Sequence, residues 1–260
     1  MKKLTIIAVR YYLPSETFFS KIEFLEKEFE TFFDQVATVF IDLNTAKDKD
    51  THGRGILSDG TWFDMSGHKT SIEYQEHSDA FLYLNDTLYT KHHASLVIAN
   101  IKNCVSTLSL AQFPMAVGSI NPSTDAMFNE GKQMSSKHLS TFCFMLNQPA
   151  NEIFKTILIS LPLESQGKNW IEGRYTKYPA LNKILYLHIF GPQNPWSWIA
   201  HMDQITSEYK IRKAICVAVE HMLSANIIIN DGLVLPTNYG AHYKLRRIFR
   251  SFFNKLKIQK

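Results

Sequence analysis

Strand-like and helix-like runs alternate through the first 160 residues, and this alternation limits the chain to few fold classes. Residues 4–9 form a short apolar run suited to a core strand, and residues 36–44 form a second, β-branched run. Between them, residues 20–33 carry apolar side chains at helical spacing, separated by acids and lysines. A strand, a helix and a strand in this order predict parallel pairing through a right-handed crossover.

The alternation resumes after a polar, irregular stretch at 45–80, in which we expect one short helix near 68–77. The fold class is therefore α/β. We divide the chain into an α/β domain at 1–200 and a helical portion at 201–260. Further strands are expected at 81–84, 113–120 and 139–147, and further helices at 149–162 and 209–228. The segment 93–110 is either a helix or a helix–strand unit, and 183–190 is either a strand or a buried helix.

The composition is that of an ordinary globular protein, with 45% hydrophobic and 20% charged residues among 260. Its three cysteines are far apart and form no CxxC pair, so neither a disulfide framework nor a cysteine zinc site is indicated. A reducing compartment fits this usage. The apolar run at 4–9 is too short for a signal peptide, and no stretch approaches the length of a bilayer span. We therefore expect a cytoplasmic protein.

Polar residues end several of the predicted strands. Asn85 and Asp86 follow the buried run 81–84, Asp42 lies near the end of the second strand, and Arg10 ends the first. Ligands of open α/β sheets bind outside the carboxyl ends of the strands, so these four residues are candidates to hold a nucleotide or its phosphates. The alternative is that each aspartate caps the turn or helix that follows it.

The stretch FLYLNDTLY at 81–89 resembles the NDS strand of the rhamnan synthesis F family, bacterial glycosyltransferase-like proteins of cell-surface polysaccharide assembly. It is also similar to the strand and DxD site of glycosyltransferases with a GT-A fold. Three later segments agree in order with the family pattern, and the resemblance covers roughly residues 81–225. These segments are MAVGSI at 115–120, KHLSTFCFMLNQPANEIF at 137–154 and VEHMLS at 219–224.

The resemblance implies a GT-A-like (Rossmann-like) mixed sheet flanked by helices, and sugar transfer from a nucleotide donor. Asn85 and Asp86 would take the position of the donor diphosphate or of a metal, Mn²⁺ or Mg²⁺. His138 and Ser140 would line the acceptor side, and Glu220 would be the acid of the late helix. The chain departs from the metal-binding pattern because Asn85-Asp86-Thr87 offers one carboxylate, not two.

An inverting transfer needs a base within reach of the acceptor hydroxyl. Glu220, Asp125, Glu130 and His138 are the candidates, and Asp125 and Glu130 lie in a polar stretch just before the strand 139–147. The alternative for Glu220 is a solvated or salt-bridged helix residue.

Three residues farther along the chain are further candidates for binding. His188 lies in the apolar run LYLHIF and could complete a metal shell, or it is a histidine of the core. Trp196 and Trp198, in GPQNPWSW, could stack on an acceptor sugar, or they close the edge of the core.

The C-terminal segment 244–260 places Leu245, Ile248, Phe249, Phe252 and Leu256 on one helical stripe among basic residues, with no acid. A basic amphipathic helix of this kind predicts binding to an anionic membrane surface. The alternative is a helix that packs on the domain through the same stripe. We find no motif of a nucleic-acid-binding fold, so no nucleic-acid partner is expected.

The resemblance implies a glycosyltransferase that moves a sugar from a nucleotide donor to a glycan or lipid-linked acceptor. With the basic C-terminal segment, we expect it to be peripheral on the inner face of the cytoplasmic membrane. One alternative is a glycosyltransferase-like binding domain without catalysis, which the single carboxylate at 85–87 suggests. Another is a hydrolase or other nucleotide-dependent transferase, although G-x-S-x-G, G-x-G-x-x-G and P-loop patterns are absent from the sequence.

Overall fold

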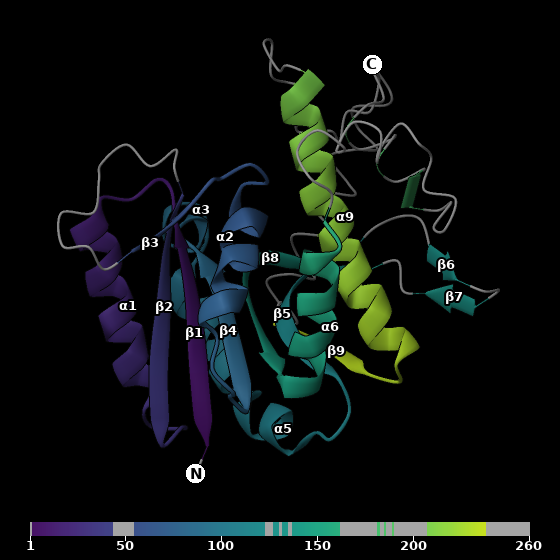
Figure 1. Ribbon diagram of the computed structural model, residues 1–260. Helices are drawn as coiled ribbons and strands as arrows, with labels where there is room; N and C mark the ends of the chain where they lie inside the picture. The colour runs from purple at the N-terminus through teal and green to yellow at the C-terminus, as the bar shows by residue number, and fades with distance from the viewer. Residues whose placement is uncertain are drawn as a thin grey trace, which may run out of the picture.

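The computed structural model describes residues 2–43, 55–122, 127–129, 132–134, 137–161, 181–182, 185, 189 and 207–237. Its main sheet has seven strands in the order β3-β2-β1-β4-β8-β5-β9 (Figure 1). The strands are β1 (Lys3–Arg10), β2 (Gln35–Leu43), β3 (Ile56–Ser58), β4 (Ala80–Asn85), β5 (Met115–Pro122), β8 (Lys137–Asn147) and β9 (Leu233–Pro236).

The sheet is mixed. β1 pairs in parallel with β2 and with β4, and β2 pairs in parallel with β3. β8 runs antiparallel to both of its neighbours, β4 and β5, and β9 is parallel to β5. This arrangement confirms the α/β class and the parallel pairing expected for the first two strands.

Helices cover both faces of the sheet. The helices are α1 (Ser15–Phe29), α2 (Asp64–Ser71), η1 (Ile72–Tyr74), α3 (Thr87–Lys91), α4 (Ala94–Lys102), α5 (Val105–Leu110), α6 (Gln148–Ile159) and α9 (Ser207–Ile229). Residues of α1, α4 and α5 share one buried apolar cluster with the sheet, and residues of α2, α6 and α9 share the other. Figure 1 shows α2, α6 and α9 along the same face.

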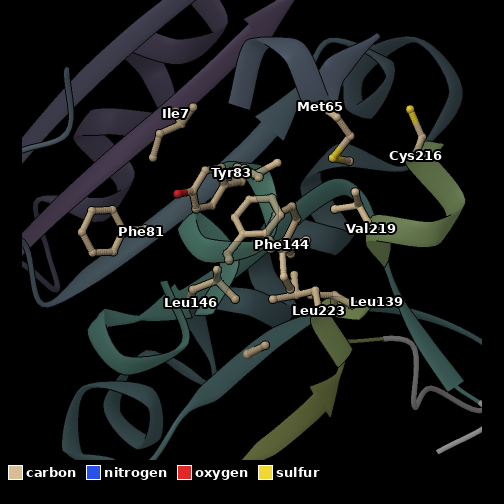
Figure 2. Close-up of a cluster of buried hydrophobic side chains, with 14 of the residues drawn as sticks. Ile7, Met65, Phe81, Tyr83, Leu139, Phe144, Leu146, Cys216, Val219 and Leu223 are labelled. Atoms are coloured by element: carbon tan, nitrogen blue, oxygen red, sulfur yellow. The ribbon is translucent and has the colours of Figure 1, made fainter. Parts of the chain in front are cut away.

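The continuous apolar run of β1 follows from this two-sided cover, because successive side chains of a strand point to opposite faces. Ile7 and Val9 lie in the cluster under α2, whereas Ile6 and Ala8 lie in the cluster under α1. Figure 2 shows the first of these clusters, in which the rings of Tyr83 and Phe144 stack with centroids 5.1 Å apart.

Several boundaries differ from the prediction. The helix expected at 20–33 begins at Ser15, directly after Pro14, whose fixed φ suits a helix start. The segment 93–110 forms two helices, α4 and α5, and the polar stretch 123–138 contains a two-stranded hairpin. This hairpin pairs β6 (Met127–Asn129) with β7 (Lys132–Met134).

The strand β9 was not expected from the sequence. Asp231 has a positive φ of 56°, and Gly232 then passes so close to the chain that a Cβ would lie 2.3 Å from the carbonyl oxygen of Pro114. This close passage lets the Leu233 N–H donate to the same oxygen at 2.9 Å, which starts the pairing with β5. The C-terminal portion, as far as Thr237, is thus built into the main sheet and its cover. Of the helices in the described ranges, none combines the length and apolarity that a membrane span needs.

Candidate functional site

The carboxyl ends of β1, β2 and β4 meet at one edge of the sheet. From β1 the chain moves to β2 and β3 on one side, and then returns to β4 on the other side of β1. This reversal is a topological switch point, where open α/β sheets form a crevice for ligands. The register places Arg10 opposite Asp42 and Val9 opposite Asn85, so the four predicted donor-binding residues lie at this edge.

Arg10 and Asp42 form a buried ion pair. Arg10 Nε donates to Asp42 Oδ1 at 2.7 Å and Nη2 donates to Oδ2 at 2.8 Å, so both carboxylate oxygens bind the guanidinium. Arg10 is 1% exposed, and its Nη1 donates to the Leu13 carbonyl at 3.1 Å. Gly55 packs on the same carboxylate, since a Cβ there would lie 2.8 Å from Asp42 Cγ. These contacts give both residues a structural role, and their predicted role in donor binding stays a prediction.

Asp86 holds the loop that follows β1. Its Oδ2 accepts hydrogen bonds from the N–H groups of Tyr11 at 3.0 Å, Leu13 at 2.8 Å and Tyr12. The side chain is completely buried, and Oδ1 has no hydrogen-bond partner in the described part of the chain. Burial raises the pKa of this carboxyl, and the three N–H donors oppose the rise. Although Asp86 precedes α3, its side chain caps no N–H of that helix.

Asn85 follows the capping alternative in part. Its Oδ1 accepts from the Thr87 N–H at 3.1 Å, which is a local turn contact, while its Nδ2 donates to Asp64 Oδ2 at 2.9 Å. The polar residues that end β4 therefore have two roles. Asp86 holds the loop after β1 by hydrogen bonds, and Asn85 binds a carboxylate on α2.

From Asn85, a series of polar contacts crosses the sheet edge to α9. Thr141 Oγ1, on β8, lies 3.3 Å from Asp64 Oδ2 and 2.9 Å from Glu220 Oε1. The Thr141 N–H donates to the same Glu220 oxygen at 3.1 Å. The other oxygen, Oε2, lies 3.7 Å from His138 Nε2. We call Asp64, Asn85, His138, Thr141 and Glu220 the Glu220 network.

The partly exposed members of the Glu220 network lie at its His138 end. The side chains of Glu220 and His138 are 13% and 15% exposed, whereas Asn85 and Asp64 are buried. The ring of His138 also lies 4.1 Å from that of His221, centroid to centroid. A small ligand that reaches the sheet edge would therefore meet the free side of the Glu220 carboxylate and the His138 imidazole first.

The turn before α2 has a strained backbone. Phe63 has φ 52° and ψ −134°, a conformation that L-residues rarely adopt. Two residues of α9 contact this turn: Cys216 Sγ donates to the Trp62 carbonyl at 3.1 Å, and Tyr209 packs its ring 5.2 Å from that of Phe63. Asp64 directly follows Phe63 in this turn. Helix α9 therefore positions both carboxylates of the Glu220 network, that of Glu220 and that of Asp64. Strain of this kind is concentrated at functional sites.

Lys213 supplies positive charge on the same helix. Burial alone would lower the pKa of its ammonium, but the acidic side chains of Cys216, Glu220 and Asp64 raise it overall. The pKa of the Cys216 thiol is itself raised by burial, so the thiol is neutral near pH 7 and the two carboxylates supply the attraction. Lys213 therefore stays protonated and offsets part of the negative charge of the network.

The residues around Asp86 do not fit a divalent cation. A hard cation needs several converging oxygen ligands, and one oxygen of Asp86 is occupied by three N–H groups. No group of three His, Cys, Asp or Glu side chains with metal-binding geometry occurs among the described residues. We derive no step through a metal, and the expected use of Mn²⁺ or Mg²⁺ stays a prediction.

Of the remaining candidates, Ser140 lies half-buried on β8, next to Thr141. Several candidates lie outside the described residues, so their predicted roles stay predictions: Asp125, Glu130, His188, Trp196, Trp198 and the segment 244–260.

Sequence reasoning missed Asp64, Thr141 and Lys213. Asp64 opens the short helix of an otherwise irregular stretch, a position that an aspartate often takes for local reasons. Thr141 lies inside the strand that carries the predicted His138 and Ser140. Lys213 precedes Glu220 by seven residues, or about two helical turns, so helical spacing alone could have placed them on one face.

Comparison with known proteins identifies no relative: no family model, no curated protein and no solved structure matches the chain.

Proposed function

We propose that this chain is a glycosyltransferase that moves a sugar from a nucleotide-sugar donor to a glycan or lipid-linked acceptor in bacterial surface polysaccharide assembly. The mixed α/β sheet supports this proposal, because its switch point offers the edge at which such folds bind nucleotides. We further propose that the sheet and its helices have a GT-A-like arrangement.

The observation that carries the proposal is the Glu220 network. Asn85, His138 and Glu220 were nominated separately by the resemblance, from positions far apart in the sequence. In the folded chain Asn85 and Glu220 are connected by polar contacts through Asp64 and Thr141, and His138 lies at ion-pair distance from Glu220, 3.7 Å from its Oε2. This convergence at the carboxyl edge of the sheet supports the proposal.

Glu220 is proposed as the general base. Its Oε1 is fixed by two hydrogen bonds from Thr141, which leaves Oε2, on the His138 side, to take a proton. As the acceptor oxygen bonds to the anomeric carbon, its proton passes to Glu220. The bond from that carbon to the diphosphate breaks, and its electron pair leaves with the diphosphate.

The site also limits where the donor can bind. Asp64, Asp86 and Glu220 repel a diphosphate, so the hydroxyl groups of a sugar suit the Glu220 network better than the phosphates do. Carboxylates accept hydrogen bonds from hydroxyl groups without a charge conflict. The phosphates are then expected farther out, toward basic side chains.

One observation favours a second candidate, a binding domain without catalysis. The carboxylates of Asp42 and Asp86, both expected to serve the donor, bind the guanidinium of Arg10 and the loop after β1. A domain that had lost donor chemistry could keep these residues for structure alone.

A thermal-shift screen against nucleoside diphosphates and nucleotide sugars, with and without Mn²⁺ or Mg²⁺, tests the proposal. A ligand that binds only the folded chain raises its melting temperature. We expect a shift with one nucleotide sugar, and dependence on the metal would support a cation at the donor. No shift with any donor would count against the transferase and favour the second candidate.

A further inference from the structure

A groove of about 850 Å³ lies between α1 and α4, on the face of the sheet opposite α2, α6 and α9. Its volume is in the range of small-molecule binding sites. The floor and walls include Lys21, Phe24 and Leu25 of α1 and Ser95, Ile98 and Ala99 of α4. None of these residues belongs to the Glu220 network.

The groove exists because the two helices pack over different strands. α1 packs on β1 and β2, whereas α4 packs on β5 and β8. Small side chains on α4, Ser95 and Ala99, leave the space between the helices open. Leu25 and Ile98 are buried at its floor, while the ring of Phe24 stands 65% exposed at its rim. The surface that remains is mainly apolar, so a ligand without hydrocarbon would gain little from it.

The two ends of the groove differ in charge. At one end, Lys102 Nζ pairs with Glu28 Oε1 at 3.3 Å. Toward the other end, Lys21 Nζ lies 5.1 Å from the centre of the Tyr89 ring and has no carboxylate partner among the described residues. Lys21 and Glu28 are seven residues apart on α1, or about 10 Å along the helix axis.

The Lys21 end lies nearer the carboxyl edge of the sheet. α1 follows the carboxyl end of β1, so its first turns, with Lys21, are closer to that edge than Glu28 is. Tyr89 belongs to α3, which begins directly after Asp86. The groove thus has an uncompensated ammonium near the edge of the candidate site and a neutral ion pair away from it.

We infer that this groove binds the hydrocarbon chain of an anionic amphiphile, with its acidic head, a phosphate or carboxylate, at Lys21. Apolar floor and walls suit an alkyl chain, and the single unpaired ammonium suits one anionic head group. The ion pair of Glu28 and Lys102 has no net charge, so the ligand needs no second charged group at that end of the groove. This inference does not depend on glycosyl transfer.

The test is calorimetric titration of the full chain with decyl phosphate below its micelle concentration. Inorganic phosphate and 1-decanol serve as the head-only and chain-only probes. We expect saturable one-to-one binding of decyl phosphate, at least tenfold tighter than inorganic phosphate. Comparable affinity for inorganic phosphate would overturn the inference, because the groove would then contribute nothing.

Two variants locate the binding. Ala99→Trp should fill the groove and lower the affinity for decyl phosphate at least tenfold, whereas Leu96→Trp, exposed on the same helix and outside the groove, should not. Lys21→Gln should lower the affinity for decyl phosphate about fivefold and leave the affinity for 1-decanol unchanged. Lys27→Gln, at an exposed position of the same helix, is its control. Unchanged binding in Ala99→Trp, or equal losses in a variant and its control, would overturn the inference. Because the readout is binding, its failure is distinguishable from absence of glycosyl transfer.

Discussion

Thr141 on β8 gives both its N–H and its hydroxyl group to one carboxylate oxygen of Glu220 on α9, at 3.1 and 2.9 Å. The hydroxyl has a single hydrogen, and Asp64 Oδ2 lies 3.3 Å from the same Oγ1. One threonine therefore lies between two carboxylates that come from different helices. This relationship is the basis of our proposal that the polar edge of the sheet serves chemistry as well as loop capping.

Thr141→Val tests this relationship. The variant keeps the N–H but loses the hydroxyl, so Glu220 should lose part of its orientation while the fold persists. We expect kcat with a nucleotide-sugar donor to fall about tenfold with little change in KM, as for a group that positions a catalytic residue. Thr107→Val, exposed on α5, is the matched control. A Thr141→Val enzyme with wild-type kcat would show that Thr141 does not position Glu220.

Asp86→Ala should be strongly destabilising. The variant leaves the N–H groups of Tyr11, Tyr12 and Leu13 without their common acceptor in a partly buried place, which we expect to cost about 3 kcal/mol of unfolding free energy. Urea unfolding measures this loss. Asp79→Ala is the control, because its exposed carboxylate accepts one backbone N–H, from Lys3. Equal losses in both variants would contradict the role assigned to Asp86.

His68 should make the fold sensitive to acid. Its ring is fully buried among Tyr83, Phe144 and Phe154, and neither ring nitrogen has a hydrogen-bond partner among the described residues. Burial lowers its pKa from 6.5 to about 4. Between these values the unfolded chain binds a proton that the folded chain does not, so stability falls as pH drops from about 6.5 toward 4.

The contribution of His68 at pH 5, relative to pH 7, is about 2 kcal/mol of lost stability. His68→Leu removes the titrating group, so the variant should lose that much less than the wild type over the same interval. Urea unfolding at the two pH values measures the difference. Identical losses in both proteins would mean that His68 titrates normally in the folded state.

The segment 244–260 carries a prediction from the sequence alone. Deleting it should release the protein from anionic liposomes, because each basic residue near such a surface contributes about 1 kcal/mol of binding. Liposome sedimentation compares the full chain with the truncated one. Equal sedimentation would favour the alternative, in which the stripe of Leu245 and Phe249 packs on the domain.

The sequence predicted the parts of the fold that rest on periodic patterns. The runs at 4–9, 36–44 and 139–147 became β1, β2 and β8. For β1 and β8 the reason is burial on both faces, which makes a strand apolar almost throughout, whereas β2 is fully buried only near its carboxyl end. β9 escaped prediction because four residues at a sheet edge carry no pattern, and its start depends on the approach of Gly232 to Pro114. The order of the strands in the sheet also depends on contacts between distant segments, so it had to come from the folded chain.

At the candidate site, the sequence predicted which polar residues lie at the sheet edge, but not which groups their side chains bind. Asp42 and Asp86 do end neighbouring strands at one edge, yet their partners, Arg10 and the loop at 11–13, are set by strand register and loop path. Asp64 could not be linked to Glu220 from sequence, since a strained residue at 63 and a threonine on a third element make the connection.

The most direct test of the central claim is turnover of nucleotide sugars by the wild type and by Glu220→Gln. The amide oxygen of glutamine can still accept both hydrogen bonds from Thr141, so the fold should survive while the base is lost. We predict that the wild type releases nucleoside diphosphate in the presence of acceptor, and that Glu220→Gln lowers kcat by at least about a hundredfold. Glu208→Gln, exposed on the same helix, should keep wild-type kcat. Wild-type kcat in a folded Glu220→Gln variant would contradict the account.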